Sequence, residues 1–436
     1  MTANLIELVD YNICVRNAEG ELARSPGFCS IANKEPLFGE PARQLSRLQP
    51  RHTLNQFWSQ LSLDPLPLKT VFRHNADLAY GHLRDLTQEL TLQGDVVLGV
   101  PSNYSRTQLA VLLGLVKQSN FTSTGLVDLA LLQALETPAE ECIVIELQLH
   151  QAVLTRLRRS EGFLVKDTVV QVPAAGILAL QDAWTNVITD EFLRQCRFDP
   201  KHNAETEQYL YNQLDGWIAQ SRQHPEVLID INHKGHVFQA RLTHEHFTKR
   251  GATVFARINR ELEPLRTADT ALHIRASQLH LPGLTTAING LIAVDDDQVM
   301  AHCLTHLDSI RRPAEALQFI TRLPLVSADA QGTIASHRLP THVLAGHKAI
   351  ALPMGRLGFG THHAEVTLAR LMPLDDFFGT VIIERHPRRL VLELRGAAPV
   401  LLNGEPARSG SSLHLGDTLQ LGAARLPLHL IHVEQD

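Results

Sequence analysis

Near its start the chain reads Leu5-Ile6-Glu7-Leu8-Val9-Asp10-Tyr11-Asn12-Ile13-Cys14-Val15, a run rich in residues that favour strands. We predict a strand over 5–15 and a second, short strand near 28–32. Residues 96–100, closed by Pro101, predict a buried strand, and 142–157 predict a hairpin of two buried strands. Because strand-forming blocks alternate with helical ones, the sequence indicates an α/β architecture with two similar lobes.

The helical blocks lie between these strands and beyond them. The apolar spacing over 177–222 predicts a long helical stretch with charged outer faces. Residues 227–242 alternate like a hairpin, with 232–235 as its turn, and a strand is expected at 271–276. Shorter helical predictions cover 40–61, 107–119, 127–135 and 245–265.

Composition narrows the classes of function. The chain has 436 residues, more than a single core of roughly 250–300 residues usually supports, so two or three domains are expected. A formal net charge of −6 argues against a basic nucleic-acid footprint. No run is apolar enough to cross a membrane, no secretory leader precedes residue 20, and the five cysteines show no CxxC spacing. We therefore expect a cytoplasmic protein that binds neither nucleic acid nor a membrane.

Histidines are abundant, but their spacing does not predict a metal site. None of the tight clusters, at His244 and His246, at His233 and His236, and at His362 and His363, has the His-Glu-x-x-His spacing that directs two imidazoles to one ion. No metal is expected.

The pattern of helical and strand-like segments changes near Pro313. Beyond 321 the chain is almost free of helical patterns and carries short strand-like runs separated by turn residues such as Asn403-Gly404. Such spacing is typical of an all-β sandwich. The expected organisation is an α/β domain over 1–312, a linker over 313–344 and a β-sandwich over 345–436. The strand-like runs are 348–352, 364–368, 379–384, 390–394, 399–402, 418–421 and 426–433.

A series of motifs over residues 5–305 resembles the DnaK-type heat-shock chaperones. Residues 6–15 are similar to that family's opening I-D-L-G-T-T-N-S-x-V, and 295–301 are similar to its D-P-D-E-A-V-A helix. The other matching segments, in the family's order, are 38–43, 49–54, 100–108, 142–156 and 274–283. The resemblance implies the two-lobed, actin-like ATPase fold of the ribonuclease H type, with a nucleotide cleft between the lobes. The positions that it assigns to this cleft are Glu7, Asp10, Asn12, Asp128, Glu146, Gln148 and Ser277.

The chain departs from the family where ATP is held. Val9 replaces the first-loop glycine, Glu146–Gln151 replaces the run D-L-G-G-G-T, and Arg275-Ala276 replaces a glycine pair. Glycine turns let backbone N–H groups approach phosphates, and side chains at these positions would fill that space. We therefore expect a pseudo-ATPase with no catalytic residue and no cofactor. The alternative is a divergent ATPase that binds ATP and Mg²⁺ through Glu7, Asp10, Asp128 and Glu146.

The β-rich end resembles the second half of a forkhead-associated (FHA) domain. Residues 400–406 and 413–422 are similar to its N-G-x-x-V-N-G and L-x-x-G-D-x-(I/L)-x-(F/L)-G patterns. FHA domains bind phosphothreonine, and the resemblance makes Arg356 a possible anion contact. Ala398 stands where the recognition asparagine belongs, and Asn403-Gly404 is expected to be a hairpin turn.

These features predict an interaction or scaffold protein with a chaperone-like fold. No peptide-binding β-domain or helical lid is visible after residue 312, so ATP-driven refolding of client proteins is not expected. The resemblance suggests an active DnaK-type or actin-like paralogue as the protein partner. A phosphopeptide-binding module at the C-terminal end is the third hypothesis.

Overall fold

The computed structural model divides the chain into two compact units, Met1–Ala328 and Asp329–Asp436. In the first unit it describes 3–325 except 68–69, 91, 93–94 and 314–315. In the second it describes 340–345, 348–352, 355–360, 379–386, 389–396, 400–407, 409–413, 415–421, 428–431 and 433. The boundary between the units falls inside the segment 313–344 that the sequence assigns to a linker.

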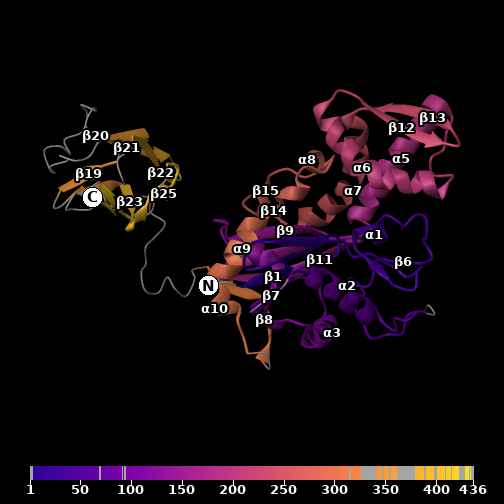
Figure 1. Cartoon of the computed structure of the whole chain (residues 1–436), viewed down its shortest axis with the longest axis horizontal. Helices are drawn as coiled ribbons and strands as arrows, with labels where there is room; N and C mark the ends of the chain where they lie inside the picture. The colour runs from indigo at the N-terminus through magenta and orange to yellow at the C-terminus, as the bar shows by residue number, and fades with distance from the viewer. Residues whose placement is uncertain are drawn as a thin grey trace. The chain divides into compact units, whose positions relative to one another are not determined.

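The first sheet of unit one has six strands in the order β16-β8-β7-β1-β2-β3. Figure 1 labels β8, β7 and β1 of this sheet. β1, β2 and β3 form an antiparallel meander, whereas β7 and β8 run parallel to β1. The crossovers to β7 and β8 pass through α2 (Asn75–Glu89) and α3 (Arg106–Lys117). The strands are β1 (Asn4–Glu7), β2 (Ile13–Arg16), β3 (Leu22–Ser25), β7 (Asp95–Val100), β8 (Thr122–Asp128) and β16 (Phe319–Ile320).

The second sheet repeats this design. Its order is β15-β14-β9-β10-β11-β17, with β9, β10 and β11 as the antiparallel meander and β14 and β15 parallel to β9. β1 and β9 are therefore equivalent first strands in the two sheets. The strands are β9 (Glu141–Leu147), β10 (Gln151–Ser160), β11 (Phe163–Pro173), β14 (Ala271–Arg275), β15 (Leu291–Val294) and β17 (Arg322–Pro324).

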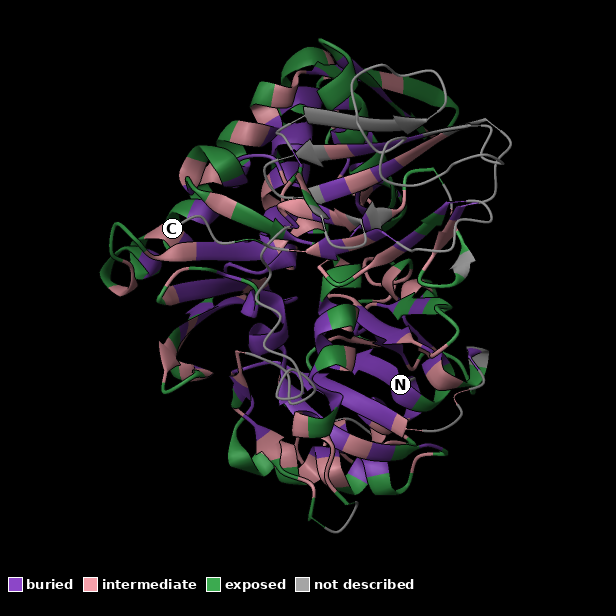
Figure 2. Cartoon of the chain, turned by 90° about the vertical axis from the view of Figure 1, so that its left-hand side faces the viewer, coloured by how far each residue is buried: buried purple, intermediate pink, exposed green. Residues whose placement is uncertain are grey.

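One apolar cluster joins the two sheets. It contains Leu5 of β1, Val97 of β7 and Val144 of β9, together with buried residues of α4 (Leu129–Ala134) and α9 (Asp296–Thr305). β1 and β7 are buried along almost their whole length (Figure 2). Because β16 and β17 extend the two sheets, unit one continues beyond residue 312.

Two smaller groups of helices and strands are attached to the two large sheets. The first is a three-stranded sheet of β4 (Cys29–Ser30), β5 (Leu37–Phe38) and β6 (Thr53–Leu54), with α1 (Glu40–Arg43) in the connection between β5 and β6. The second lies at one end of unit one in Figure 1 and combines the hairpin β12 (Val227–His233) and β13 (His236–Leu242) with three helices. The helices are α5 (Ile177–Cys196), α6 (Ala204–Gln223) and α7 (His244–Leu262). Short helical turns complete the unit: η1 (Glu263–Leu265), η2 (Ala276–Gln278), α8 (Leu284–Ala287) and α10 (Leu307–Ile310).

Unit two contains two antiparallel sheets, of order β19-β18-β27-β26-β23-β24 and β20-β21-β22-β25. Val343 and Leu430 of the first sheet share one apolar cluster with Val381 and Leu392 of the second. The strands of the first sheet are β18 (His342–Ala345), β19 (Lys348–Ala351), β23 (Val400–Leu402), β24 (Glu405–Pro406), β26 (Thr418–Leu421) and β27 (Leu428–Ile431). Those of the second are β20 (Gly355–Gly360), β21 (Gly379–His386), β22 (Arg389–Gly396) and β25 (Ser412–Leu413). The strand expected at 364–368 lies outside the described residues.

Three expectations about secondary structure are wrong in detail. The strand over 5–15 is two strands joined by a turn, in which the N–H of Asn12 bonds to the carbonyl of Val9 at 2.9 Å. The helix over 40–61 stops at Arg43 and continues as turns, and Pro50 excludes a continuous helix there. The stretch over 177–222 is two helices, because Arg197 closes α5 in the left-handed conformation and Pro200 follows it.

Candidate functional site

The candidate site lies where the equivalent strands β1 and β9 end. The loop after β1 carries Asp10, and the loop after β9 carries Gln148 and Leu149. The two loops touch directly, since Asp10 Oδ1 accepts a hydrogen bond from the backbone N–H of Leu149 at 2.8 Å. No residue in either loop has a positive φ. The backbone N–H of Leu149, which could otherwise face a phosphate, is therefore already bound to the carboxylate of Asp10.

Asp10 is enclosed by this contact. The residue is 4% exposed, and its Oδ2 atom has no hydrogen-bond partner among the described residues. Burial raises its pKa from 3.8 to about 6, although the bond from Leu149 opposes the shift. An inward-facing carboxylate of this kind would repel a triphosphate rather than bind it.

Leu149 fills the space beside Asp10 with apolar atoms. Its side chain is 2% exposed and packs with the buried Phe28 and Ala42 and with the half-buried Tyr11 and Leu178. These contacts join the β9–β10 loop to the β4–β6 region. Leu149 is thus part of an apolar core in this loop.

Glu146 and Gln148 form the second wall of the site. Gln148 Nε2 donates to Glu146 Oε1 at 2.7 Å and to Asn103 Oδ1 at 3.0 Å. Burial raises the pKa of Glu146 from 4.5 to about 8; the bond from Gln148 opposes this shift, and the neighbouring Asp128 and Asp10 add to it. Glu146 is therefore mostly protonated at neutral pH and does not offer a full negative charge to a metal ion.

Asp128 ends β8 and is held in a structural network. Its Oδ2 lies 2.6 Å from Lys166 Nζ, and its Oδ1 accepts bonds from Ser102 Oγ at 2.5 Å and from the N–H of Ala130 at 3.1 Å. The last bond caps α4. Burial is the largest influence on its pKa and raises it, against the opposing effect of Lys166. Asp128 thus forms an ion pair with Lys166 inside the protein and caps α4.

Arg275, which the sequence suggested only as a lost glycine, is the most informative residue of the site. From the end of β14 it reaches across to Glu7 of β1, with which it forms an ion pair, and it also bonds to Asp296 Oδ1 at 3.0 Å. Asp296 in turn pairs with Arg24 of β3. Burial lowers the pKa of Arg275 to about 10, so it stays charged at neutral pH. A guanidinium of the chain itself therefore occupies the position between the lobes and neutralises Glu7.

The space left beside the Glu7–Arg275 pair is small, whereas a separate cavity of about 440 Å³ lies next to Phe28 and His150. The cavity between the sheets measures about 40 Å³, and sites for drug-sized ligands typically measure roughly 300–1,000 Å³. One water molecule takes a share of about 30 Å³ in the liquid. The residues present therefore do not fit ATP with Mg²⁺. The cavity is lined by Glu7, Val9, Tyr11, Asn12, Cys14, Arg24, Gln133, Glu146, Arg275, Ser277, Gln278 and Asp296.

Of the seven cleft positions, the structure brings four to the cavity wall: Glu7, Asn12, Glu146 and Ser277. Asn12 is half-buried and Ser277 is exposed. Asp10, Asp128 and Gln148 lie beside the cavity in the networks described above.

Arg356, the possible anion contact, lies in β20, where its backbone pairs with that of Glu384. Its side chain lies outside the described part of the chain, as does Ala398. Asn403 and Gly404 both have positive φ and join β23 to β24, and Asn403 Nδ2 donates to Asp417 Oδ1 at 2.8 Å. These two residues form the expected hairpin turn.

Among the described residues, no group of three His, Cys, Asp or Glu side chains is arranged to hold a metal ion. His244 and His246 lie in the first turn of α7, where His244 Nδ1 is 2.9 Å from Ser221 Oγ. In the same described part, no helix has the length and apolar character needed to span a bilayer.

Stability should depend on pH through Glu146. Because its folded pKa of about 8 lies above the ordinary 4.5, the folded state keeps this proton to higher pH than the unfolded state does. The free energy of unfolding should therefore fall as pH rises between these values, by at most about 1.4 kcal/mol per pH unit from this group. Urea unfolding of Glu146→Gln should show a shallower decline than the wild type between about pH 6.5 and 8.5.

The exposed Glu19→Gln variant is the matched control and should keep the wild-type slope. Between pH 6.5 and 8.5 the buried His82 and His273 should add little to the slope. Burial lowers their pKa values to about 3 and 4, so their effect on the free energy of unfolding falls mainly at lower pH. Equal slopes for Glu146→Gln and the wild type would show that Glu146 is ionised in the folded state at neutral pH.

No protein-family model matches the chain, and no curated protein matches it with significance.

Proposed function

We propose that this chain is a catalytically silent relative of the DnaK-type ATPases that acts as an interaction or scaffold protein. The repeated strand order of the two sheets supports the actin-like fold that the sequence motifs imply. The contact between the two first-strand loops supports the assignment of the cleft. The shared apolar core of the two sheets in unit two supports an FHA-like sandwich.

The filled cleft is the observation that carries the proposal. Leu149 occupies the second phosphate loop, Arg275 pairs with Glu7 across the site, and about 40 Å³ remains. The alternative of a divergent ATPase requires Glu7, Asp10, Asp128 and Glu146 to be free for a metal ion. In the structure Glu7 and Asp128 have cationic partners, Asp10 Oδ1 is bound by the N–H of Leu149, and burial favours the protonated form of Glu146.

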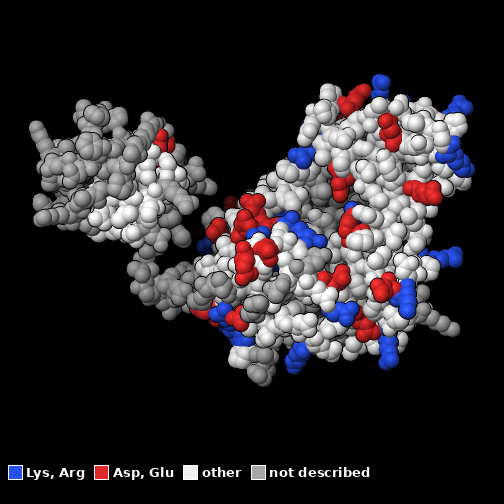
Figure 3. Space-filling model, in the orientation of Figure 1, with Lys and Arg blue, Asp and Glu red and all other residues white. Residues whose placement is uncertain are grey.

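The distribution of charge supports a protein partner rather than a nucleic acid. On the face drawn in Figure 3, described lysines and arginines are scattered, and acidic side chains lie among them. Binding of a phosphate backbone needs a clustered basic surface. An active DnaK-type or actin-like paralogue remains our prediction for the partner, by analogy of fold.

Isothermal titration with ATP and Mg²⁺ tests the proposal. We expect no saturable heat at ATP concentrations up to the millimolar range and no phosphate release above the buffer rate. The reason is that a nucleotide would have to expel Leu149 and break the pair between Arg275 and Glu7. Micromolar binding with phosphate release would establish the divergent ATPase instead.

A further inference from the structure

The hairpin β12–β13 has two outer edges, and its turn fixes which backbone groups face outward. Lys234 and Gly235 both have positive φ, of 51° and 79°, which is the two-residue turn whose closing pair, His233 and His236, is hydrogen-bonded. In an antiparallel ladder hydrogen-bonded and non-hydrogen-bonded pairs alternate. The outward-facing groups of β12 therefore belong to Leu228, Asp230 and Asn232, and those of β13 to Val237, Gln239 and Arg241.

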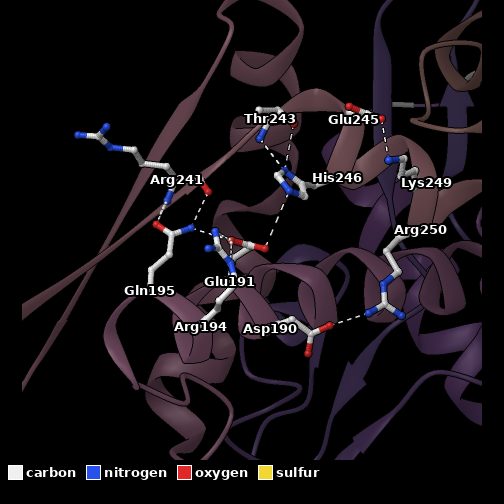
Figure 4. A network of polar contacts seen from close by, with 10 residues as sticks. All are labelled: Asp190, Glu191, Arg194, Gln195, Arg241, Thr243, Glu245, His246, Lys249 and Arg250. Carbon is white, nitrogen blue, oxygen red and sulfur yellow. Dashed lines mark hydrogen bonds and ion pairs between the residues drawn. The ribbon is translucent and has the colours of Figure 1, made fainter.

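A side chain of α5 closes one end of the β13 edge, at Arg241. Gln195 Oε1 accepts the N–H of Arg241 at 2.9 Å, and Gln195 Nε2 donates to the carbonyl of Arg241 at 2.9 Å (Figure 4). Glu191 holds this amide in place through a bond of 2.7 Å. The contact independently confirms that Arg241 faces outward.

The edge of β12 is open. Within the described part of the chain, no hydrogen bond reaches the outward N–H or carbonyl groups of Leu228, Asp230 or Asn232. A groove of about 790 Å³ lies beside the turn end of this edge, from Asp230 to Lys234, between the hairpin and the first half of α6. Tyr209 on α6 and Leu228 on β12 are 41% and 49% exposed. An open strand edge is a template for another strand, and proteins usually cover or blunt it.

The charge at the centre of this edge indicates what binds there. Asp230 is exposed and forms no ion pair with another described residue. A second copy paired about a twofold axis at Asp230 would place two aspartates directly opposite each other, which is unfavourable. A strand with a basic residue opposite Asp230 would instead gain a cross-strand ion pair.

We propose that the β12 edge binds an extended peptide of a partner protein by strand addition, with a basic residue opposite Asp230 and apolar residues on either side of it. Main-chain bonds to Leu228, Asp230 and Asn232 supply the affinity, and Asp230 with Tyr209 supplies the selectivity. This inference deepens the proposed interaction role and rests on it.

Fluorescence anisotropy with the full chain tests the binding. The probe is a labelled nine-residue peptide of alternating threonine and valine with one central lysine, and the control peptide has glutamate in its place. We expect the lysine peptide to bind about five- to tenfold more tightly. Asp230→Lys should reverse this preference, and Asp269→Lys, the same charge change at an exposed turn away from the hairpin, should leave it unchanged.

Amide hydrogen exchange locates the peptide. Binding should slow exchange at Leu228, Asp230 and Asn232 and leave Val237 and Gln239 unaffected. The proposal is overturned if neither peptide binds, if Asp230→Lys does not alter the preference, or if the protected amides lie elsewhere. A dimer of the free chain that already protects the three β12 amides would also overturn it. ATP binding in the titration above would refute the silent-cleft proposal without changing any of these outcomes.

Discussion

Replacement of Arg275 by methionine is expected to lower the free energy of unfolding by about 3–5 kcal/mol, because Glu7 would be left as an uncompensated buried charge. The side chains of Arg275 and Glu7 are 13% and 8% exposed, so the pair is largely shielded from bulk solvent. Asp296 would keep Arg24 as its partner. Urea unfolding monitored by circular dichroism measures the change.

The matched control is Arg16→Met, which removes a pair whose partner Asp297 is 87% exposed. A loss of roughly 0–1 kcal/mol is expected there. The double variant Glu7→Gln/Arg275→Met should recover part of the lost stability, since the stranded carboxylate is then neutral. Equal losses for Arg275→Met and Arg16→Met would contradict the role assigned to the cross-cleft pair.

Replacement of Lys166 by methionine should have an effect of similar size. Asp128 is fully buried and Lys166 Nζ, at 2.6 Å, is its cationic partner. The variant leaves the carboxylate with the bonds from Ser102 and Ala130 alone. We expect a loss of about 3–5 kcal/mol in urea unfolding.

Asp128→Asn in the Lys166→Met background provides the control for this pair. Asparagine can still cap α4 and accept from Ser102 but carries no charge. The double variant should be more stable than Lys166→Met alone. If it is equally unstable, Lys166 acts through its aliphatic packing and not through the ion pair.

Regular patterns made much of the α/β unit predictable. The hairpin at Cys142–Leu157 and the strand before Pro101 appear in the structure as β9–β10 and β7. Each of these strands contains a short apolar run, at 96–98, 142–145 and 152–154, as expected for strands buried on both faces. The helix predicted from Glu40 to Leu61 is wrong. The apolar spacing of this segment is helical, but in the structure the segment is formed by turns and by contacts with residues distant in sequence.

Only part of the chemistry of the cleft could be predicted from the sequence. The sequence has no glycine at Val9 or over Glu146–Gln151, where the DnaK-type pattern that it resembles has glycine, and this difference predicted that phosphate would not fit. The partner of Glu7 was not visible, since Arg275 lies 268 positions away along the chain. An arginine in place of a glycine at the end of a strand was the available signal, and the parallel pairing of β14 with β9 was needed to interpret it.

A crystal of the full chain soaked with a non-hydrolysable ATP analogue and Mg²⁺ tests the central claim most directly. We expect Arg275 to remain paired with Glu7, Leu149 to remain packed on Phe28, and no density for the analogue between the lobes. Triphosphate density between Asp10 and Gln148, with Arg275 displaced from Glu7, would contradict the account.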